Sequence, residues 1–282
     1  MSKSSATISD PDAHIARKRF GQNFLQDPAI IARIVAAIRP QTGDRLVEIG
    51  PGQAAITASL IAGCGHVHAI EIDRDLAARL RERFDAASLT VDERDVLKVD
   101  FALLSRDLGG RLRIVGNLPY NISSPILFHL LGYAEFIIDQ HVMLQKEVVD
   151  RMVADHGSKT YGRLSVMLQA RYDMTRCLKV PPGAFTPAPK VDSAVVRMVP
   201  IAQPQVQNWS VFSALVAAAF STRRKMLRNT LAAYGEAIDW DLVGIAPTQR
   251  AEEVSVVQFI GLANLLTNSL PANTASANLT SN

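Results

Sequence analysis

Between residues 45 and 199, short apolar runs alternate with longer amphipathic segments. Apolar runs bounded by glycine, proline or charged residues are typical of buried strands, and Leu76, Leu80 and Phe84 recur at helical spacing. Strands that alternate with helices predict a parallel sheet covered by helices on both faces. The predicted strands span residues 45–49, 66–72, 89–91, 112–116 and 140–144.

The last two predicted strands, residues 176–180 and 193–199, are joined differently from the others. The proline-rich segment 181–190 separates them, and no helix fits into it. Parallel strands need a long crossover, whereas antiparallel strands can be joined by a loop. We therefore expect this pair to be antiparallel, and the sheet to be mostly parallel with an antiparallel last strand.

The pattern changes at about residue 203, after which only helical periodicity remains. We predict a Rossmann-like α/β domain over residues 13–202 and a small all-helical domain over residues 203–268. Residues 1–12 are rich in serine, and residues 269–282 consist mainly of Asn, Ser, Thr and Ala. Both ends lack periodicity and are predicted to be disordered tails.

Length and composition narrow the protein class. The 282 residues, of which 48% are hydrophobic, suffice for a large core. The longest apolar stretches are broken short of a membrane span, and no charged-then-apolar signal segment opens the chain. Only two cysteines, Cys64 and Cys177, occur, which does not suggest a disulfide framework. We expect a cytoplasmic protein without a membrane segment.

A glycine-containing loop, Gly50-Pro51-Gly52, directly follows the first predicted strand. Glycines at such a strand end let a ligand approach the backbone. Glu71 ends the next strand about 20 residues later, where a carboxylate can accept hydrogen bonds from ribose hydroxyls. A dinucleotide is disfavoured, because Ala55 replaces the third glycine of the pattern and Pro51 removes an N–H. The loop predicts a nucleoside-containing ligand.

Asp95 follows the third predicted strand and lies on the same edge of the sheet as the loop and Glu71. Its carboxylate can accept a hydrogen bond from the amine of adenine. The alternative is a helix N-cap, since aspartate is also favoured there.

The tetrapeptide Asn117-Leu118-Pro119-Tyr120 follows the strand 112–116. The exocyclic amine of adenine is a poor nucleophile because its lone pair is delocalised into the ring. The Asn117 oxygen and a carbonyl beside Pro119 can accept both N–H groups and aim the lone pair at an electrophile. Tyr120 can stack on the base. The alternative for these four residues alone is an ordinary turn.

These motifs together resemble those of the S-adenosylmethionine-dependent ribosomal RNA adenine dimethyltransferases. The resemblance covers residues 17 to 260, and the stretch 221–229 is most similar to the bacterial small-subunit branch of that family. The segments that carry it are residues 17–25, 48–52, 71–73, 95, 117–120 and 185–193.

The resemblance implies a Rossmann-like methyltransferase sheet with S-adenosylmethionine as cofactor. By analogy, the substrate would be N6 of two adjacent adenines near the 3′ end of small-subunit (16S) ribosomal RNA, within an immature 30S subunit, with a role in subunit biogenesis. A monomer is the default expectation. The residues expected to contact the cofactor are Asn23, Leu25, Gly50, Gly52, Glu71, Asp95 and Asn117.

Three alternatives stay open or are disfavoured. One is a relative of the antibiotic-resistance type that methylates large-subunit RNA. Methylation of either RNA needs the same binding of adenine, so the catalytic motifs do not distinguish the two. Another is an RNA-binding assembly factor that is mainly non-catalytic. A nicotinamide-dependent oxidoreductase is disfavoured by the chemistry of the glycine loop.

The residues predicted to hold the target adenine are Asn117, Leu118, Pro119, Tyr120 and Phe185. Phe185, in the proline-rich loop, is expected to form a second aromatic wall opposite Tyr120. Its alternative is a buried phenylalanine that anchors the loop. No side chain is assigned as a base, because the neutral Asn117 amide orients N6 rather than deprotonating it.

Cationic residues form three groups that are predicted to bind the RNA backbone. On a predicted helix, Arg224 and Arg228 would share one face, and Leu227, Leu231 and Tyr234 would face the core. The alternative is a solvated cationic surface. The groups are Arg17, Lys18 and Arg19; Lys159 and Arg163; and Arg223, Arg224, Lys225 and Arg228.

A possible metal site at Cys64, His66 and His68 is rejected. The two histidines would share one face of a strand, but no further ligand occurs at a recognisable spacing. Methyl transfer from a sulfonium needs no metal, so no metal is expected.

Overall fold

The structure, a computed structural model, describes residues 23–203 and 205–269. The predicted tail 1–12, the cations Arg17, Lys18 and Arg19, and nearly all of the predicted tail 269–282 lie outside these residues.

A seven-stranded sheet in the order β4-β3-β2-β5-β6-β9-β7 forms the centre of the fold. The strands β4, β3, β2, β5 and β6 are parallel to one another, and β9 is antiparallel to both β6 and β7. This arrangement confirms the mostly parallel sheet with an antiparallel last strand. The bounds are β2 Leu46–Ile49, β3 Val67–Ile70, β4 Leu89–Asp92, β5 Leu112–Asn117, β6 Ile137–Gln145, β7 Tyr172–Val180 and β9 Ser193–Pro200.

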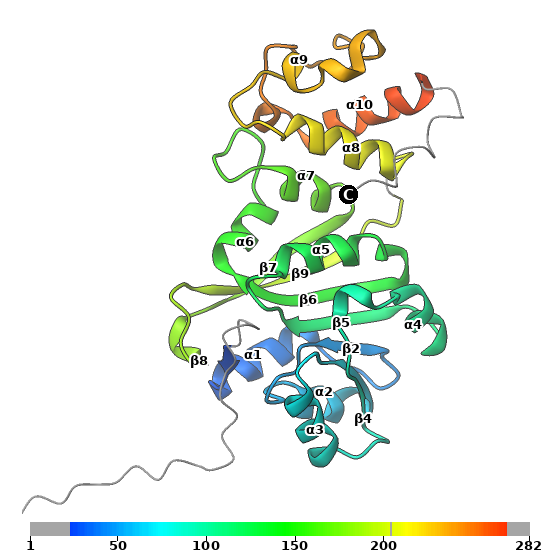
Figure 1. The fold of residues 1–282 in the computed structure, drawn as a ribbon. Coiled ribbons are helices and arrows are strands. Elements are labelled where there is room, and N and C mark those ends of the chain that lie inside the picture. Colours follow the sequence, from blue (N-terminus) through cyan, green and yellow to red (C-terminus); the bar gives the residue numbers. More distant parts are fainter. Residues whose placement is uncertain (1–22, 204, 270–282) are drawn as a thin grey trace, which may run out of the picture.

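Helices cover both faces of the sheet, as Figure 1 shows. The helices α1 to α3 pack on one face of the sheet and α4 to α7 on the other. One buried apolar cluster lies under each of these two groups of helices. The bounds are α1 Pro28–Ile38, α2 Thr57–Cys64, α3 Arg74–Arg83, α4 Phe101–Asp107, α5 Ser123–Leu131, α6 Lys146–Met152 and α7 Arg163–Gln169.

Local sequence sets the ends of α1, which carries the chain from the small strand β1 (Phe24–Leu25) to the sheet. Asp27 caps its start, because its carboxylate accepts hydrogen bonds from the amides of Ala29 and Ile30 at 2.8 and 3.1 Å. Pro28 occupies the first turn, where its missing N–H is not needed.

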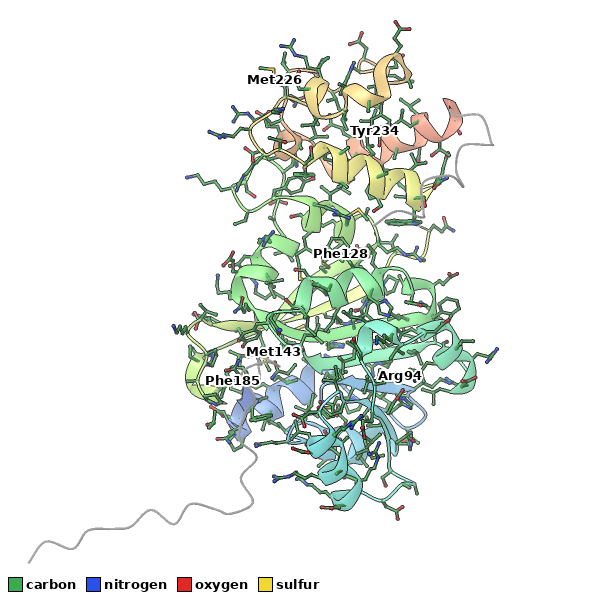
Figure 2. All side chains as sticks on the ribbon, viewed as in Figure 1. Arg94, Phe128, Met143, Phe185, Met226 and Tyr234 are labelled. Carbon is green, nitrogen blue, oxygen red and sulfur yellow. The ribbon has the colours of Figure 1, made fainter. Side chains whose placement is uncertain are left out.

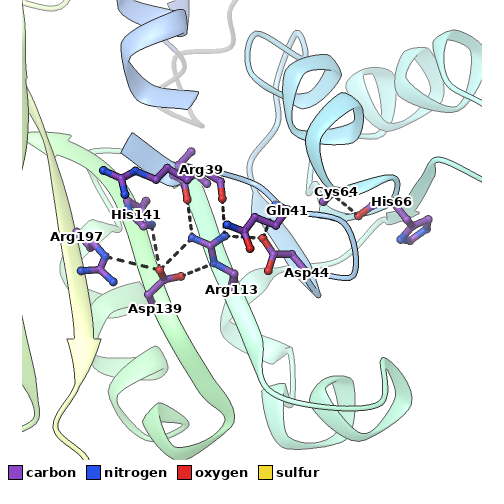
Figure 3. Close-up of polar contacts among 10 residues, drawn as sticks. Arg39, Gln41, Asp44, Cys64, His66, Arg113, Asp139, His141 and Arg197 are labelled. Atoms are coloured by element: carbon purple, nitrogen blue, oxygen red, sulfur yellow. Dashed lines mark hydrogen bonds and ion pairs between the residues drawn. The ribbon is translucent and has the colours of Figure 1, made fainter. Parts of the chain in front are cut away.

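A buried arginine fixes the end of α1 to the sheet, as Figure 3 shows. Arg113 on β5 donates to both carboxylate oxygens of Asp139 on β6, at 2.9 and 3.1 Å, and to Asp44 at 2.5 Å. It also donates to the carbonyls of Ile38 and Arg39 at 2.6 and 3.2 Å. These carbonyls are the unpaired acceptors of a helix end, so the cation satisfies them.

A second core lies beyond α7, where the helices α8 (Trp209–Ala219), α9 (Leu227–Thr230) and α10 (Val256–Ser269) pack together. The helix α7 contributes to both cores. Its Leu164 and Leu168 face the sheet, whereas Val166 and Met167 belong to the helical cluster. Two short 3-10 turns, Ala232–Ala237 and Ala251–Glu253, complete this part of the chain.

The predicted continuous helix through residues 224–234 is wrong. Met226 is extended and forms an isolated antiparallel bridge with Arg250, and the amide of Leu227 donates to the carbonyl of Gln249 at 2.8 Å. Arg224 therefore lies in a turn before α9 rather than on one face with Arg228. The predicted core side is correct for Leu227, which is fully buried.

Candidate functional site

An open cavity lies at the carboxyl ends of β2, β3 and β5, where the strand order of the sheet reverses. Such a reversal point is the usual ligand site of an open parallel sheet. Every residue predicted to contact a cofactor lines it, and so do Leu118, Pro119 and Tyr120. The predicted residues brought together are Asn23, Leu25, Gly50, Gly52, Glu71, Asp95 and Asn117.

The glycine loop has a backbone that favours glycine. Gly50 and Gly52 have positive φ angles of 65° and 58°, in the left-handed region that side chains disfavour. The Gly50 amide donates to the carbonyl of Ile70 at 2.9 Å, which ties the loop to β3. A Cβ atom on Gly52 would lie 3.3 Å from the ring of Phe24, so glycine also avoids a tight contact there.

Glu71 is nearly buried beside this loop. One carboxylate oxygen accepts from the Gly52 amide at 3.2 Å and the other from the Asp73 amide at 2.9 Å. Burial raises the pKa of Glu71 above its ordinary value, and these hydrogen bonds act in the opposite direction. A carboxylate oxygen can accept more than one hydrogen bond, so both Glu71 oxygens can still accept hydrogen bonds from the hydroxyl groups of a ligand.

Asp95 has the capping role that was the alternative prediction, and it also lies at the cavity. Its Oδ1 atom accepts from the Leu97 amide at 3.0 Å and caps the 3-10 turn Val96–Lys98. Asp95 also lines the cavity, so its carboxylate has acceptor capacity left for a ligand.

Asn117 ends β5 at the floor of the cavity. Its Nδ2 atom donates to the backbone carbonyl of Asn23 at 3.1 Å, so the amide nitrogen faces the N-terminal segment. The next residue is also held, because the Leu118 amide donates to the carbonyl of Met143 at 3.1 Å. Figure 2 labels Met143 near the centre of the sheet. The Asn117 oxygen is therefore held in a defined orientation as an acceptor.

Tyr120 follows on the loop between β5 and α5. Its phenol oxygen lies 2.6 Å from the hydroxyl of Ser193 on β9. Burial raises the pKa of Tyr120, and the hydrogen bond to Ser193 lowers it to a smaller extent. The phenol is protonated near neutral pH, so the ring is a neutral surface.

Phe185 does not line the cavity. It lies in the short strand β8 (Phe185–Thr186), which pairs antiparallel with β1 so that Phe185 is opposite Leu25. Its exposed fraction is 3%, and it packs in the cluster under α1, beside which Figure 2 labels it. This arrangement matches the alternative of a buried loop anchor rather than an aromatic wall.

Sequence reasoning missed two buried titratable residues at this cavity, Glu48 and His141. Burial raises the pKa of Glu48 to about 7, and the nearby carboxylate of Glu71 shifts it in the same direction. Burial lowers the pKa of His141 to about 4, although Asp139 lies 3.9 Å from its Nδ1. A carboxylate in the middle of the apolar strand 46–49 was the available signal for Glu48.

The predicted cationic groups that the structure describes are exposed. Arg223 donates to the backbone carbonyl of Lys159 and forms an ion pair with Glu252 at 3.2 Å. The second and third cationic groups are thus neighbours at the helical end of the molecule. Arg163 lies 5.1 Å above the ring of Phe128, which fixes its position on α7.

The residues of the rejected metal site have other partners. The Cys64 thiol donates to the carbonyl of His66 at 3.0 Å, as Figure 3 shows, and the His66 ring bonds the hydroxyl of Thr90 at 3.0 Å. His68 lies 3.7 Å from Asp92. Within residues 23–203 and 205–269, no three potential ligands form a metal cluster, and no helix is long and apolar enough to cross a membrane.

The cavity fits S-adenosylmethionine. The glycine loop leaves space along the backbone, and Glu71 and Asp95 present acceptors at neighbouring strand ends. The side chains of Glu48 and Glu71 are buried beside the cavity, and a positively charged ligand there would favour their charged forms.

Comparison with known proteins identifies relatives over nearly the whole chain. The family described as ribosomal RNA adenine dimethylase matches residues 13–268. A protein of Bordetella bronchiseptica named ribosomal RNA small subunit methyltransferase A is 58% identical over 256 residues, which cover 90% of this chain and 95% of the relative.

Two solved structures have similar folds. A dimethyladenosine transferase from Plasmodium falciparum superimposes with a TM-score of 0.71 at 24% identity, covering 87% of this chain and 98% of the other. The 23S rRNA methyltransferase ErmE superimposes with a TM-score of 0.68 at 26% identity, covering 87% and 100%.

Proposed function

The chain belongs to the ribosomal RNA adenine dimethylase family, and we propose that it methylates N6 of adenine in small-subunit (16S) ribosomal RNA. It is an S-adenosylmethionine-dependent methyltransferase with a Rossmann-like sheet. The relative named as a small-subunit enzyme is 58% identical, against 26% for the large-subunit enzyme, which favours small-subunit RNA. Retention of Gly50, Glu71 and Asn117 disfavours a purely non-catalytic assembly factor.

The observation that carries the proposal is the orientation of Asn117 at the cavity. Because its amide nitrogen donates to the Asn23 carbonyl, its oxygen is the atom that can accept an N–H of adenine. A carbonyl beside Pro119 would accept the other N–H. These two acceptors would turn the N6 lone pair toward the methyl group.

The remaining roles follow from the cavity. When bound, S-adenosylmethionine would supply the electrophilic methyl group that N6 accepts, with the sulfonium sulfur as the leaving group. Gly50, Gly52, Glu71 and Asp95 would hold the donor, and Tyr120 would stack on the base. N6 becomes acidic as it gains positive charge, so its proton can leave to water without a side-chain base.

The finer substrate is part of the same proposal. The protein would act as a monomer on two adjacent adenines near the 3′ end of the RNA, in an immature 30S subunit, and therefore in the cytoplasm. The exposed cations at Lys159, Arg163 and Arg223 to Arg228 would contact the RNA backbone.

A labelling experiment tests the proposal. The protein is incubated with labelled S-adenosylmethionine and either undermethylated small subunits or naked large-subunit RNA, and the modified bases are mapped by mass spectrometry. We expect dimethyladenosine at adjacent positions of small-subunit RNA only. Label in large-subunit RNA alone, or in neither RNA, contradicts the proposal.

A further inference from the structure

Ser193 is a polar residue held at a fully buried position of the sheet. It is the first residue of β9 and is paired with Gln145 of β6 on one side and with Val180 of β7 on the other. Its exposed fraction is 0%, and the residues that follow it, Ala194 and Val195, are also buried. A strand paired on both sides has a rigid backbone, so the hydroxyl has a fixed origin.

The partner of this hydroxyl is the phenol of Tyr120, 2.6 Å away. Burying an unpaired hydroxyl is unfavourable, so the bond satisfies Ser193 as well as Tyr120. No other hydrogen bond of the Ser193 side chain occurs among the interactions of the described residues. The contact joins β9 to the loop after β5, across 73 positions of sequence.

Two hydrogen bonds hold Tyr120, one at its backbone and one at the tip of its ring. At the backbone, the Tyr120 carbonyl accepts from the Ser123 hydroxyl at 3.3 Å at the start of α5. At the tip of the ring, the bond to Ser193 fixes the phenol oxygen. With the backbone and the phenol oxygen both held, the ring has little freedom to tilt, and Tyr120 lines the cavity.

We propose that Ser193 is a positioning residue for methyl transfer, which fixes the tilt of the Tyr120 ring before the target adenine enters. This inference rests on the proposed function, because it assigns the Tyr120 ring as the surface on which the adenine stacks. A preset ring lets the base bind with N6 already aligned, so less orientational freedom is lost in reaching the transition state.

A double-mutant cycle isolates the bond. Ser193→Ala removes one oxygen and Tyr120→Phe removes the other while keeping the aromatic ring. We expect each variant to lower kcat/KM for the RNA about tenfold, which corresponds to about 1.4 kcal/mol. The double variant should be no worse than either single variant, because the same bond is lost in all three.

Ser105→Ala is the matched control. Ser105 is also buried, and its hydroxyl donates to the carbonyl of Gly110 at 2.9 Å, outside the residues that line the cavity. We expect it to keep the wild-type kcat/KM. Cofactor affinity by calorimetry and the melting temperature are measured for every variant, since a merely structural role of Ser193 would lower these together with activity.

The outcomes separate this inference from the proposed function. The role of Ser193 is overturned if the wild type methylates small-subunit RNA and both single variants keep its rate. It is also overturned if the losses of the two single variants multiply in the double variant. In either case the proposed function stands. If Ser193→Ala does not fold, Tyr120→Phe still decides, because wild-type activity in that variant contradicts the inference. A wild type that methylates no ribosomal RNA overturns the proposed function, and the inference with it.

Discussion

The side-chain amide of Asn117 donates a hydrogen bond of 3.1 Å to the backbone carbonyl of Asn23, which precedes it by 94 residues. An asparagine amide has distinct donor and acceptor ends, so this bond sets which end faces the cavity. The segment before α1 thereby orients the side chain at the end of β5. A side chain oriented in this way is suited to accept an N–H from a base.

Replacing Asn117 by alanine should lower the methylation rate about 100-fold or more, because N6 would lose an acceptor that aligns its lone pair. Initial rates of methyl incorporation into undermethylated small subunits measure the effect. Asn264→Ala is the control, since Asn264 bonds the backbone of Gln205 and Gln207 in the helical part. A wild-type rate in Asn117→Ala would exclude the assigned role.

The raised pKa of Glu48, about 7 in the folded protein against an ordinary value of 4.5, should make stability depend on pH. Because the folded state binds this proton more tightly, the contribution is fully present below about pH 4.5 and is lost as pH rises through about 7. Glu48→Gln should therefore lose less unfolding free energy than the wild type between pH 5 and pH 8. Urea denaturation at both pH values measures the difference.

The exposed Glu82→Gln variant is the control for that measurement, and it should follow the wild-type pH dependence. If Glu48→Gln also follows the wild type, Glu48 does not titrate in this range.

Arg113→Met should destabilise the protein by about 3 to 5 kcal/mol, because it leaves the buried carboxylate of Asp139 without its bidentate partner. Guanidinium denaturation measures the loss. Arg106→Ala, which removes an exposed pair with Asp107 at 3.2 Å, should change stability by less than about 1 kcal/mol. Equal effects in the two variants would argue against the buried network.

Replacing Arg224 and Lys225 together by alanine should weaken RNA binding and make it less sensitive to salt. Each lost phosphate contact is expected to reduce the slope of log affinity against log salt by about 0.7 to 0.9. Fluorescence anisotropy with a small-subunit RNA fragment from low to high salt measures the slope. Lys98→Ala, an exposed cation on the α/β part, should keep the wild-type slope, and an unchanged slope in the double variant would remove these residues from the interface.

The sequence predicted the sheet well where strands are uniformly apolar. It shortened β6 and β7, because the N-terminal half of each contains an aspartate, Asp139 and Asp173, that interrupts the apolar pattern. In the structure Asp139 is buried and neutralised by Arg113, which comes from another strand. A partner so distant in the chain leaves no local signal.

The positions of the candidate cofactor residues were predictable, because they belong to local motifs. The glycine loop, Glu71 and Asp95 lie at the edge where parallel strand ends meet, as their positions after successive strands implied. The burial of Phe185 depends on pairing with Leu25, and the break at Met226 depends on its bridge to Arg250. These long-range contacts override the local pattern that sequence reasoning uses.

Because α7 supplies Leu164 and Leu168 to one core and Val166 and Met167 to the other, the molecule has no plane along which it divides cleanly. Separating the two parts would expose one apolar side of this helix whichever part kept it. Melting should therefore be cooperative across both cores of the described residues, and the distance from the exposed cations of the helical part to the cavity should stay constant.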